Sequence, residues 1–119
     1  MASVLFLTTD MMFSSRVLGA AGALGIECKL IGRAQQLDGI TAGDCRLALI
    51  DLGLQPLDLP AAVAAIRAAA PDAKIVAFGP HVDEQLLASA KSAGCDVVLP
   101  RSQFHNQYVE LLRAAAGSS

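Results

Sequence analysis

Short runs of consecutive apolar residues recur along the chain and predict β-strands. Each run spans four or five residues and is closed by a polar, glycine or proline residue. Runs without polar alternation are typical of strands that are covered on both faces. The predicted strands are 3–7, 28–31, 47–51, 74–78 and 96–99.

Between these runs the apolar residues recur every three or four positions, which predicts helices. Pro60 fits the first position of one helix, and Gly25 and Gly94 fit the positive-φ positions that end two others. Ser102 is the predicted N-cap of the last helix. The predicted helices are 13–24, 61–70, 82–93 and a C-terminal helix that carries the stripe Phe104, Tyr108, Leu111, Leu112 and Ala115.

Strands and helical segments alternate along the chain, with 32–44 predicted to hold at most a short helix and a loop, and 117–119 predicted to be frayed. This alternation predicts an α/β fold, a flavodoxin-like three-layer sandwich with a five-stranded parallel sheet of order 2-1-3-4-5. In that order a site lies at the carboxyl ends of the first and third strands. Asp10 and Asp51 fall at that edge.

Length and composition indicate one domain over residues 1–119, with 54% hydrophobic and 17% charged residues. The formal net charge is −2 and no basic stripe occurs, so we expect no binding to nucleic acid. No apolar run reaches the roughly 18 residues of a membrane span, and no basic segment precedes the first strand, as an export signal would require. We therefore expect a cytoplasmic protein that does not bind a membrane.

The cysteines are three in number, Cys28, Cys45 and Cys95, and none lies in a C-x-x-C pair. An odd number without paired spacing favours neither a disulfide framework nor a zinc site. We expect buried, unreactive thiols in a reducing compartment.

Asp10 after the first strand, Asp51 at the end of the third, and the passage AGCDVVLP before the last helix resemble the receiver domains of bacterial two-component response regulators. The resemblance covers nearly the whole chain. It implies an aspartate that accepts phosphate from a histidine kinase at the end of the third strand, and an acidic pair after the first strand that holds magnesium. It also implies a serine or threonine at the end of the fourth strand and a lysine before a proline after the fifth.

Two of these five positions match and three depart. Asp51 matches the phosphoacceptor, and Asp10 matches one member of the acidic pair, so both are weak candidates for magnesium ligands. Thr9 stands at the other acidic position, Gly79 at the hydroxyl position and Leu99 at the lysine position. Without these groups the site is expected to bind magnesium weakly and to accept phosphate poorly. It also lacks the hydroxyl group that would hydrogen-bond a phosphoryl oxygen and so transmit the signal.

Asp10 and Asp51 each have a second interpretation that needs no phosphate. Asp10 is either a magnesium ligand or an N-cap of the helix that follows, and capping is the commoner role of an aspartate there. Asp51 is either phosphorylated or a carboxylate that accepts hydrogen bonds from local backbone N–H groups and water.

Three further residues are candidates for the mouth of the site. Met11 adjoins Asp10, and because a helix cannot bury Met11 and Met12 on one narrow stripe, at least one is expected to be exposed. His81 is either part of an acid–base or metal site or, more commonly, a solvated loop residue. Arg101 is close enough in sequence to turn its guanidinium toward the site, but we do not expect it to do so. On the last helix, we expect Tyr108 to pack in the core and His105 to be solvated.

These observations predict a stand-alone, non-enzymatic pseudo-receiver that acts in signalling through protein–protein contacts. The resemblance implies a partner surface formed by 84–91, 96–98 and 103–113, with a homodimer through the same surface as a further expectation. One alternative is a phosphorylatable single-domain response regulator of a two-component system, with Asp51 as acceptor. The other is a flavodoxin-like module that binds a small ligand, although TTDMMFSS lacks the glycine-rich loop of a flavin site. No cofactor is expected beyond weakly bound magnesium.

Overall fold

The computed structural model describes residues 3–32, 45–53, 58–79 and 84–117. Its strands and helices alternate as the apolar pattern predicts, except between β2 and β3, where most of the intervening residues lie outside the described ranges. They are β1 (Ser3–Leu7), α1 (Met11–Ala23), β2 (Glu27–Ile31), β3 (Cys45–Asp51), α2 (Leu59–Ala69), β4 (Lys74–Gly79), α3 (Glu84–Ser92), β5 (Val97–Pro100) and α4 (Arg101–Gly117). The predicted short helix within 32–44 lies almost wholly outside the described residues, as do the first two residues of the predicted helix 82–93.

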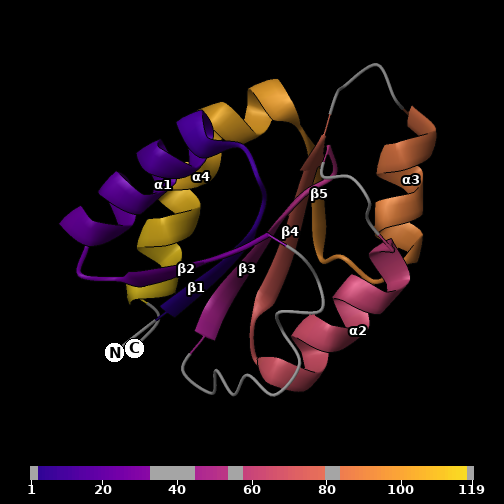
Figure 1. The fold of residues 1–119 in the computed structure, drawn as a ribbon, viewed down its shortest axis with the longest axis horizontal. Helices are drawn as coiled ribbons and strands as arrows, with labels where there is room; N and C mark the ends of the chain where they lie inside the picture. Colours follow the sequence, from indigo (N-terminus) through magenta and orange to yellow (C-terminus); the bar gives the residue numbers. More distant parts are fainter. Residues whose placement is uncertain (1–2, 33–44, 54–57, 80–83, 118–119) are drawn as a thin grey trace.

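The five strands form one parallel sheet of order β2-β1-β3-β4-β5, which confirms the predicted flavodoxin-like order. Helices α1 and α4 cover one face of the sheet, and α2 and α3 cover the other (Figure 1). All carboxyl ends of the strands therefore meet at one edge of the sheet.

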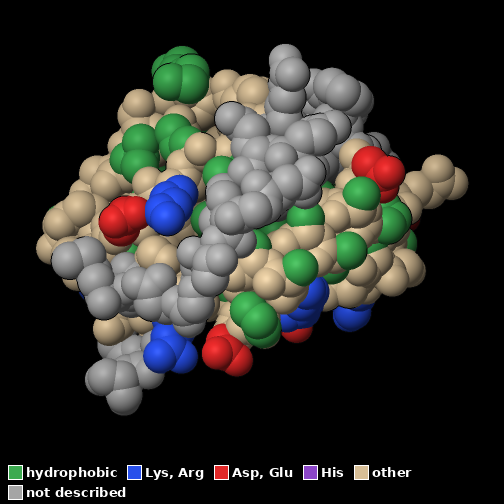
Figure 2. Space-filling model, turned by 60° about the horizontal axis from the view of Figure 1, so that its bottom comes forward, with side chains coloured by type: hydrophobic (Ala, Val, Ile, Leu, Met, Phe, Trp, Pro, Cys, Tyr) green, Lys and Arg blue, Asp and Glu red, His purple; other side chains and the backbone are tan. Residues whose placement is uncertain are grey.

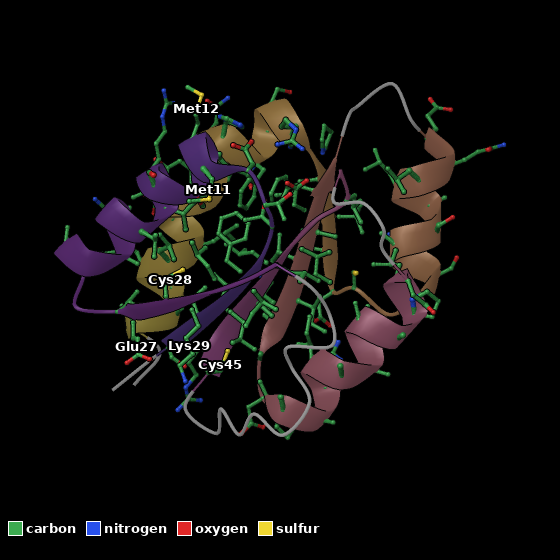
Figure 3. All side chains as sticks on the ribbon, in the orientation of Figure 1. Met11, Met12, Glu27, Cys28, Lys29 and Cys45 are labelled. Atoms are coloured by element: carbon green, nitrogen blue, oxygen red, sulfur yellow. The ribbon has the colours of Figure 1, made fainter. Side chains whose placement is uncertain are left out.

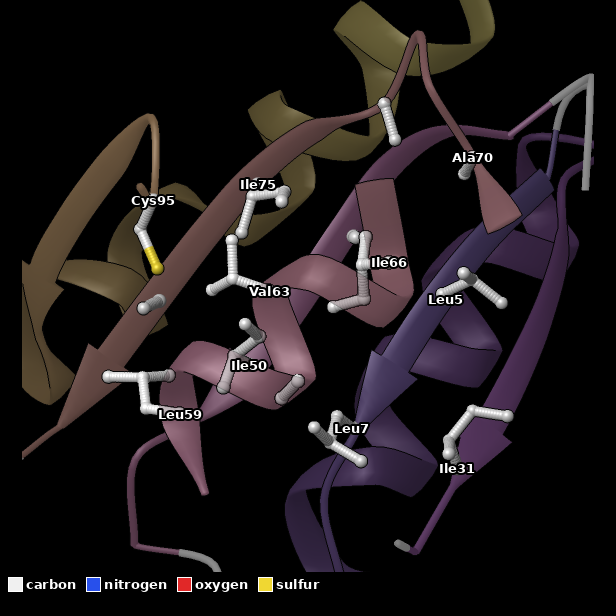
Figure 4. Close-up of a cluster of buried hydrophobic side chains, with 14 of the residues drawn as sticks. Leu5, Leu7, Ile31, Ile50, Leu59, Val63, Ile66, Ala70, Ile75 and Cys95 are labelled. Atoms are coloured by element: carbon white, nitrogen blue, oxygen red, sulfur yellow. The ribbon is translucent and has the colours of Figure 1, made fainter. Parts of the chain in front are cut away.

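Burial on both faces explains why the central strands carry apolar residues at consecutive positions. Side chains of β1, β3 and β4 alternate between two hydrophobic clusters, one under α1 and α4 and the other under α2 and α3. Figure 4 shows the second cluster, in which Leu5, Ile50 and Ile75 from the strands face Val63 and Ile66 from α2. Ala62 of α2 is buried in the same cluster.

The ends of the helices follow the predicted signals in part. Gly25 and Gly94 have φ values of +74° and +107°, as their predicted positions require. The predicted N-cap at Ser102 is wrong, because α4 begins at Arg101. Strand β5 stays paired through Pro100, opposite Gly79, and so leaves no residue for a separate cap.

Figure 2 shows one face of the molecule, on which Lys and Arg side chains lie close to Asp and Glu side chains. Among the described residues visible there, no basic stripe crosses the face. None of the helices in the described ranges has the length and apolar character of a membrane span.

Asp96 joins three elements at the start of β4 and β5. Its Oδ2 accepts a hydrogen bond from the backbone N–H of Ile75 at 2.8 Å and from Nη2 of Arg67 on α2 at 3.1 Å. The Ile75 N–H, followed by the Arg67 guanidinium, holds the pKa of the Asp96 carboxyl below its ordinary value, against the opposing effect of burial. The ionised form is thus the one that stabilises this junction.

We predict that Asp96→Asn destabilises the fold at neutral pH and that the difference from the wild type shrinks in acid. A carboxyl whose pKa is lowered by folding contributes its full stability above the ordinary aspartate pKa, about 3.9, and loses it as the pH falls through the lower folded value. Urea unfolding of both proteins across this range measures the effect. Asp72→Asn is the control, because exposed Asp72 makes no hydrogen bond or ion pair within the described part of the chain. A difference that stays constant down to the lowest pH would contradict the prediction.

Candidate functional site

Thr8 and Asp51 lie side by side at the carboxyl edge of the sheet. Strand β1 pairs with β3 so that Leu7 faces Ile50, which places the next residue of each strand at neighbouring positions. The Thr8 hydroxyl donates a hydrogen bond of 2.8 Å to Oδ2 of Asp51, and both side chains are buried. The same Thr8 oxygen accepts the backbone N–H of Asp10 at 3.0 Å.

The Asp51 carboxylate is satisfied by groups of the chain itself. Besides the Thr8 hydroxyl, the backbone N–H of Gly53 donates to Oδ1 at 2.9 Å, and so does Nη2 of Arg101 at 2.9 Å. The predicted local backbone donor is therefore present, in the N–H of Gly53. The Arg101 guanidinium is a further donor to the same carboxylate, and it is charged. Asp51 is only 5% exposed, so these donors replace most of the hydration that an ionised carboxylate needs.

Arg101 is the cation of the site, contrary to our expectation that it stays away. It is the first residue of α4, and its guanidinium lies between two carboxylates, with Nη1 4.0 Å from Oδ2 of Asp10 and Nη2 on Asp51. The guanidinium carbon lies 5.2 Å from the centre of the Phe78 ring, within the range of a cation–π contact. Because α4 begins earlier than predicted, Arg101 is held at the strand edge instead of in a loop.

Asp10 is the N-cap of α1, which confirms one of its two interpretations. Its Oδ1 accepts the backbone N–H of Phe13 at 3.1 Å, a bond that satisfies one of the free donors at the helix start. Its other oxygen, Oδ2, faces Arg101.

The two carboxylates at this edge both face a guanidinium, so a magnesium ion there would have to compete with Arg101. Magnesium prefers several hard oxygen ligands in an octahedral arrangement. In the described part of the chain, no group of three or more His, Cys, Asp or Glu side chains is placed to hold a metal. The two carboxylates that the resemblance suggested already flank a guanidinium, and Thr9 is exposed beside them.

Gly79 and Leu99 lack the groups that the resemblance implies, and the structure accounts for each residue. A Cβ atom at Gly79 would lie 3.1 Å from Cβ of buried Leu52, so a serine or threonine there would press on the core. Leu99 is buried in the cluster under α1 and α4, together with Phe78 and Phe104. The positive charge enters the site two residues later, at Arg101.

Met11 and Met12 lie at the start of α1 and are both exposed, by 69% and 82% (Figure 3). This confirms the prediction that at least one of the two methionines is exposed. His105 of α4 is exposed as predicted, but its ring also stacks on Phe13 with centroids 4.1 Å apart. His81 lies outside the described residues.

The cysteines are consistent with unreactive thiols. None forms a disulfide; Cys45 and Cys95 are buried and Cys28 is half-buried. Burial raises the pKa of Cys28 and of Cys95 to about 11. Little of either thiol is ionised at neutral pH, so neither is an effective nucleophile.

Thr8 is the site residue that the sequence interpretation did not consider. Thr8 directly follows β1 and Asp51 closes β3, but the two become neighbours only in the observed register, which pairs Leu7 with Ile50. The resemblance implies an acidic pair after the first strand, at Thr9 and Asp10, and assigns no role to Thr8.

We predict that Arg101→Gln destabilises the fold by about 1–3 kcal/mol, because it leaves a buried carboxylate without its cation. Asp51→Asn in the same chain should recover part of that loss, so that the double variant is more stable than the sum of the single changes implies. Urea unfolding of the four proteins measures this coupling.

Arg113→Gln is the matched control on the same helix. Arg113 pairs with Glu110 at 3.2 Å, but both side chains are mostly exposed, so its loss should change stability by less than about 0.5 kcal/mol. Strictly additive effects of Arg101→Gln and Asp51→Asn would show that the ion pair contributes nothing.

Comparison with known proteins gives matches among solved structures only. No family model matches the chain, and no curated protein does. The receiver domain of NtrX from Brucella abortus is 21% identical, with 98% of this chain and 99% of that chain covered and a TM-score of 0.74. The receiver domain of the sensor histidine kinase PA1611 from Pseudomonas aeruginosa, which holds magnesium in its active-site cleft, is 17% identical over 97% of each chain, with a TM-score of 0.73.

A third structure shows that the fold is not confined to proteins named as response regulators. It comes from Burkholderia thailandensis, is named for a proposed part in pilus assembly, and is 21% identical over 100% of both chains, with a TM-score of 0.69. At these identities the similarity concerns the fold. The chain therefore has the flavodoxin-like fold of response-regulator receiver domains.

Proposed function

We propose that the chain is a pseudo-receiver, a non-enzymatic signalling module that acts through protein contacts and is not regularly phosphorylated on Asp51. The observation that carries the proposal is the position of Arg101. Its guanidinium lies between Asp10 and Asp51, where a receiver of the ordinary kind would need a divalent cation.

Electrostatics supports this proposal. Transfer of a phosphoryl group to a carboxylate depends on cations that neutralise the charge developing on the transferred group. A magnesium ion at Asp51 would have to displace Arg101 from a 2.9 Å ion pair and from the Phe78 ring. Arg101 provides one positive charge and no open coordination position for a phosphoryl oxygen.

The end of β4 also supports the proposal. Gly79 has no hydroxyl to contact a phosphoryl group, and Leu52 occupies the space into which such a side chain would extend. A phosphoryl group on Asp51 would therefore lack the group that reports its arrival at the helices beyond β4.

The proposed partner surface is formed by α3, β5 and α4, over residues 84–91, 96–98 and 103–113. The exposed positions of α3 include Glu84, Gln85 and Lys91, and those of α4 include Glu110 and Arg113. Such a polar surface suits a reversible contact with another protein better than permanent burial. A cytoplasmic location is part of the same proposal.

Treatment with a phosphodonor tests the proposal. We expect that acetyl phosphate with magnesium leaves the intact mass unchanged, and that beryllofluoride leaves the amide signal of Gly53, the backbone donor to Asp51, in place. A receiver domain known to be phosphorylated, treated in parallel, shows that the reagents are active.

Asp51→Asn and Arg101→Ala are the informative variants. A magnesium-dependent mass increase in the wild type that Asp51→Asn abolishes would establish the alternative, a phosphorylatable response regulator. If Arg101 excludes the metal, Arg101→Ala should show larger magnesium-induced shifts near Asp10 and Asp51 than the wild type. Visible absorbance of the purified protein would favour the third possibility, a flavin-binding module.

A further inference from the structure

Gly53 lies against the ion pair between Asp51 and Arg101. It follows the end of β3 by two residues, and its backbone N–H donates to Oδ1 of Asp51 at 2.9 Å. Nη2 of Arg101 donates to the same oxygen, also at 2.9 Å. Gly53 and Arg101 therefore share one acceptor atom.

The backbone conformation of Gly53 does not require a glycine. In the described part of the chain, the glycines with positive φ are Gly25 and Gly94, and Gly53 is not among them. A residue with a side chain can therefore adopt the φ of Gly53 without the strain of the left-handed region. Glycine also lowers stability here, because it adds conformational freedom to the unfolded chain. The explanation for a glycine at this position must therefore come from its surroundings.

The space beside Gly53 is taken by the ion pair. A Cβ atom at this position would lie 3.2 Å from Oδ1 of Asp51 and 3.3 Å from Nη2 of Arg101. Both distances are shorter than an ordinary van der Waals contact, so one of the two side chains would have to move. A methyl group here thus presses on both halves of the pair at once.

Arg101 is the partner that can move. The Asp51 side chain is 6% exposed, and its Oδ2 accepts the Thr8 hydroxyl at 2.8 Å. The Arg101 side chain is 33% exposed and is the longer and more flexible member of the pair. A side chain at position 53 would therefore shift the guanidinium and leave the carboxylate in place.

Gly79 provides a contrast at the same edge of the sheet. A Cβ atom there would lie 3.1 Å from Cβ of Leu52, which is buried in the core. A substitution at Gly79 would thus disturb the core, whereas one at Gly53 acts on a charged contact.

We propose that Gly53 determines which cation neutralises Asp51. With no side chain at position 53, the guanidinium of Arg101 lies on the carboxylate and closes the edge to a metal ion. With a side chain there, Arg101 is held away from Oδ1, and the same oxygen is free to bind a divalent cation. Gly53 is thus a positioning residue that acts through Arg101. This assignment deepens the pseudo-receiver proposal and rests on it for the exclusion of magnesium.

The two carboxylates explain why a divalent cation would replace the guanidinium. Oδ2 of Asp10 lies 4.0 Å from Nη1 of Arg101, and Oδ1 of Asp51 lies 2.9 Å from Nη2. When the guanidinium moves away, two negative groups lose the cation between them, which is unfavourable where one of them is buried. Magnesium prefers oxygen ligands and supplies the charge that these carboxylates then lack.

A thermodynamic cycle between positions 53 and 101 tests the contact. Gly53→Ala and Gly53→Val are compared in the wild type and in Arg101→Ala by urea unfolding in the presence of EDTA. We expect both substitutions to raise the equilibrium constant of unfolding more in the wild type than in Arg101→Ala. The expected difference is about threefold for alanine and about tenfold for valine, which adds two methyl groups to the Cβ atom.

Gly22→Ala on α1 is the matched control. The φ of Gly22 is not positive, and a Cβ atom there would meet nothing within 4 Å. The substitution should stabilise the wild type and Arg101→Ala to the same extent. An effect of the substitutions at Gly53 that is equal with and without the Arg101 side chain would overturn the proposal, since the backbone alone would then account for the glycine.

Magnesium titration tests the choice of cation. Amide chemical shifts next to Asp10 and Asp51 are followed during addition of magnesium chloride, and circular dichroism checks that each variant is folded. We expect Gly53→Val to bind magnesium about tenfold more tightly than the wild type and to approach the affinity of Arg101→Ala. Gly53→Ala, the smaller change, should show an intermediate affinity.

Asp51→Asn in the Gly53→Val protein should abolish the gain in magnesium affinity. If neither Gly53→Ala nor Gly53→Val binds magnesium more tightly than the wild type, Gly53 does not determine the cation.

These measurements can fail independently of the pseudo-receiver proposal, because neither of them uses a phosphodonor. Phosphorylation of the wild type, together with the expected coupling in the unfolding cycle, would overturn the pseudo-receiver proposal and leave Gly53 as the residue that places Arg101 on Asp51. Additive effects in the cycle, without phosphorylation of the wild type, would overturn the assignment of Gly53 alone.

Discussion

The ion pair between Asp51 and Arg101 is the interaction on which the carboxyl edge of the sheet depends. Asp51 ends a strand buried on both faces, so its carboxylate leaves the core with little access to water. A buried carboxylate needs donors or a cation close by. Arg101 supplies the cation from the first turn of α4, and thereby connects the third strand to the last helix. The charge of Asp51 is thereby balanced within the chain itself.

The packing around Phe78 keeps Arg101 in this position. Phe78 stacks on Phe104 of α4 with ring centres 4.0 Å apart and nearly parallel planes, while its other contacts reach Phe6 and Phe13. Four aromatic rings from β1, α1, β4 and α4 thus pack together, and one of them, Phe78, lies under the guanidinium. The charged contact and the aromatic cluster support each other, because α4 cannot shift along the sheet without disturbing both.

The sequence predicts the layers of this fold better than the chemistry of its edge. Consecutive apolar residues reveal the buried strands, and local signals such as Asp10, Gly25 and Gly94 reveal the ends of α1 and α3, because each acts on its own neighbours. Arg101 and Thr8 act on Asp51, which is distant in sequence. Their contacts depend on the pairing of β1 with β3 and on β5 continuing directly into α4, and neither follows from local propensity. The resemblance to receiver domains shows which side chains are absent at Thr9, Gly79 and Leu99. It does not show that Arg101 supplies the positive charge instead.

The aromatic residues of this chain are few, with one tyrosine and no tryptophan. Tyr108 is partly buried on α4, and its ring lies edge-on to Phe13 of α1 with centres 5.4 Å apart. All tyrosine fluorescence of the protein therefore arises at the junction of α1 and α4. Because Tyr108 contacts Phe13 where α1 and α4 pack, a change in the packing of these two helices should change the tyrosine fluorescence. The change can be measured without an added label.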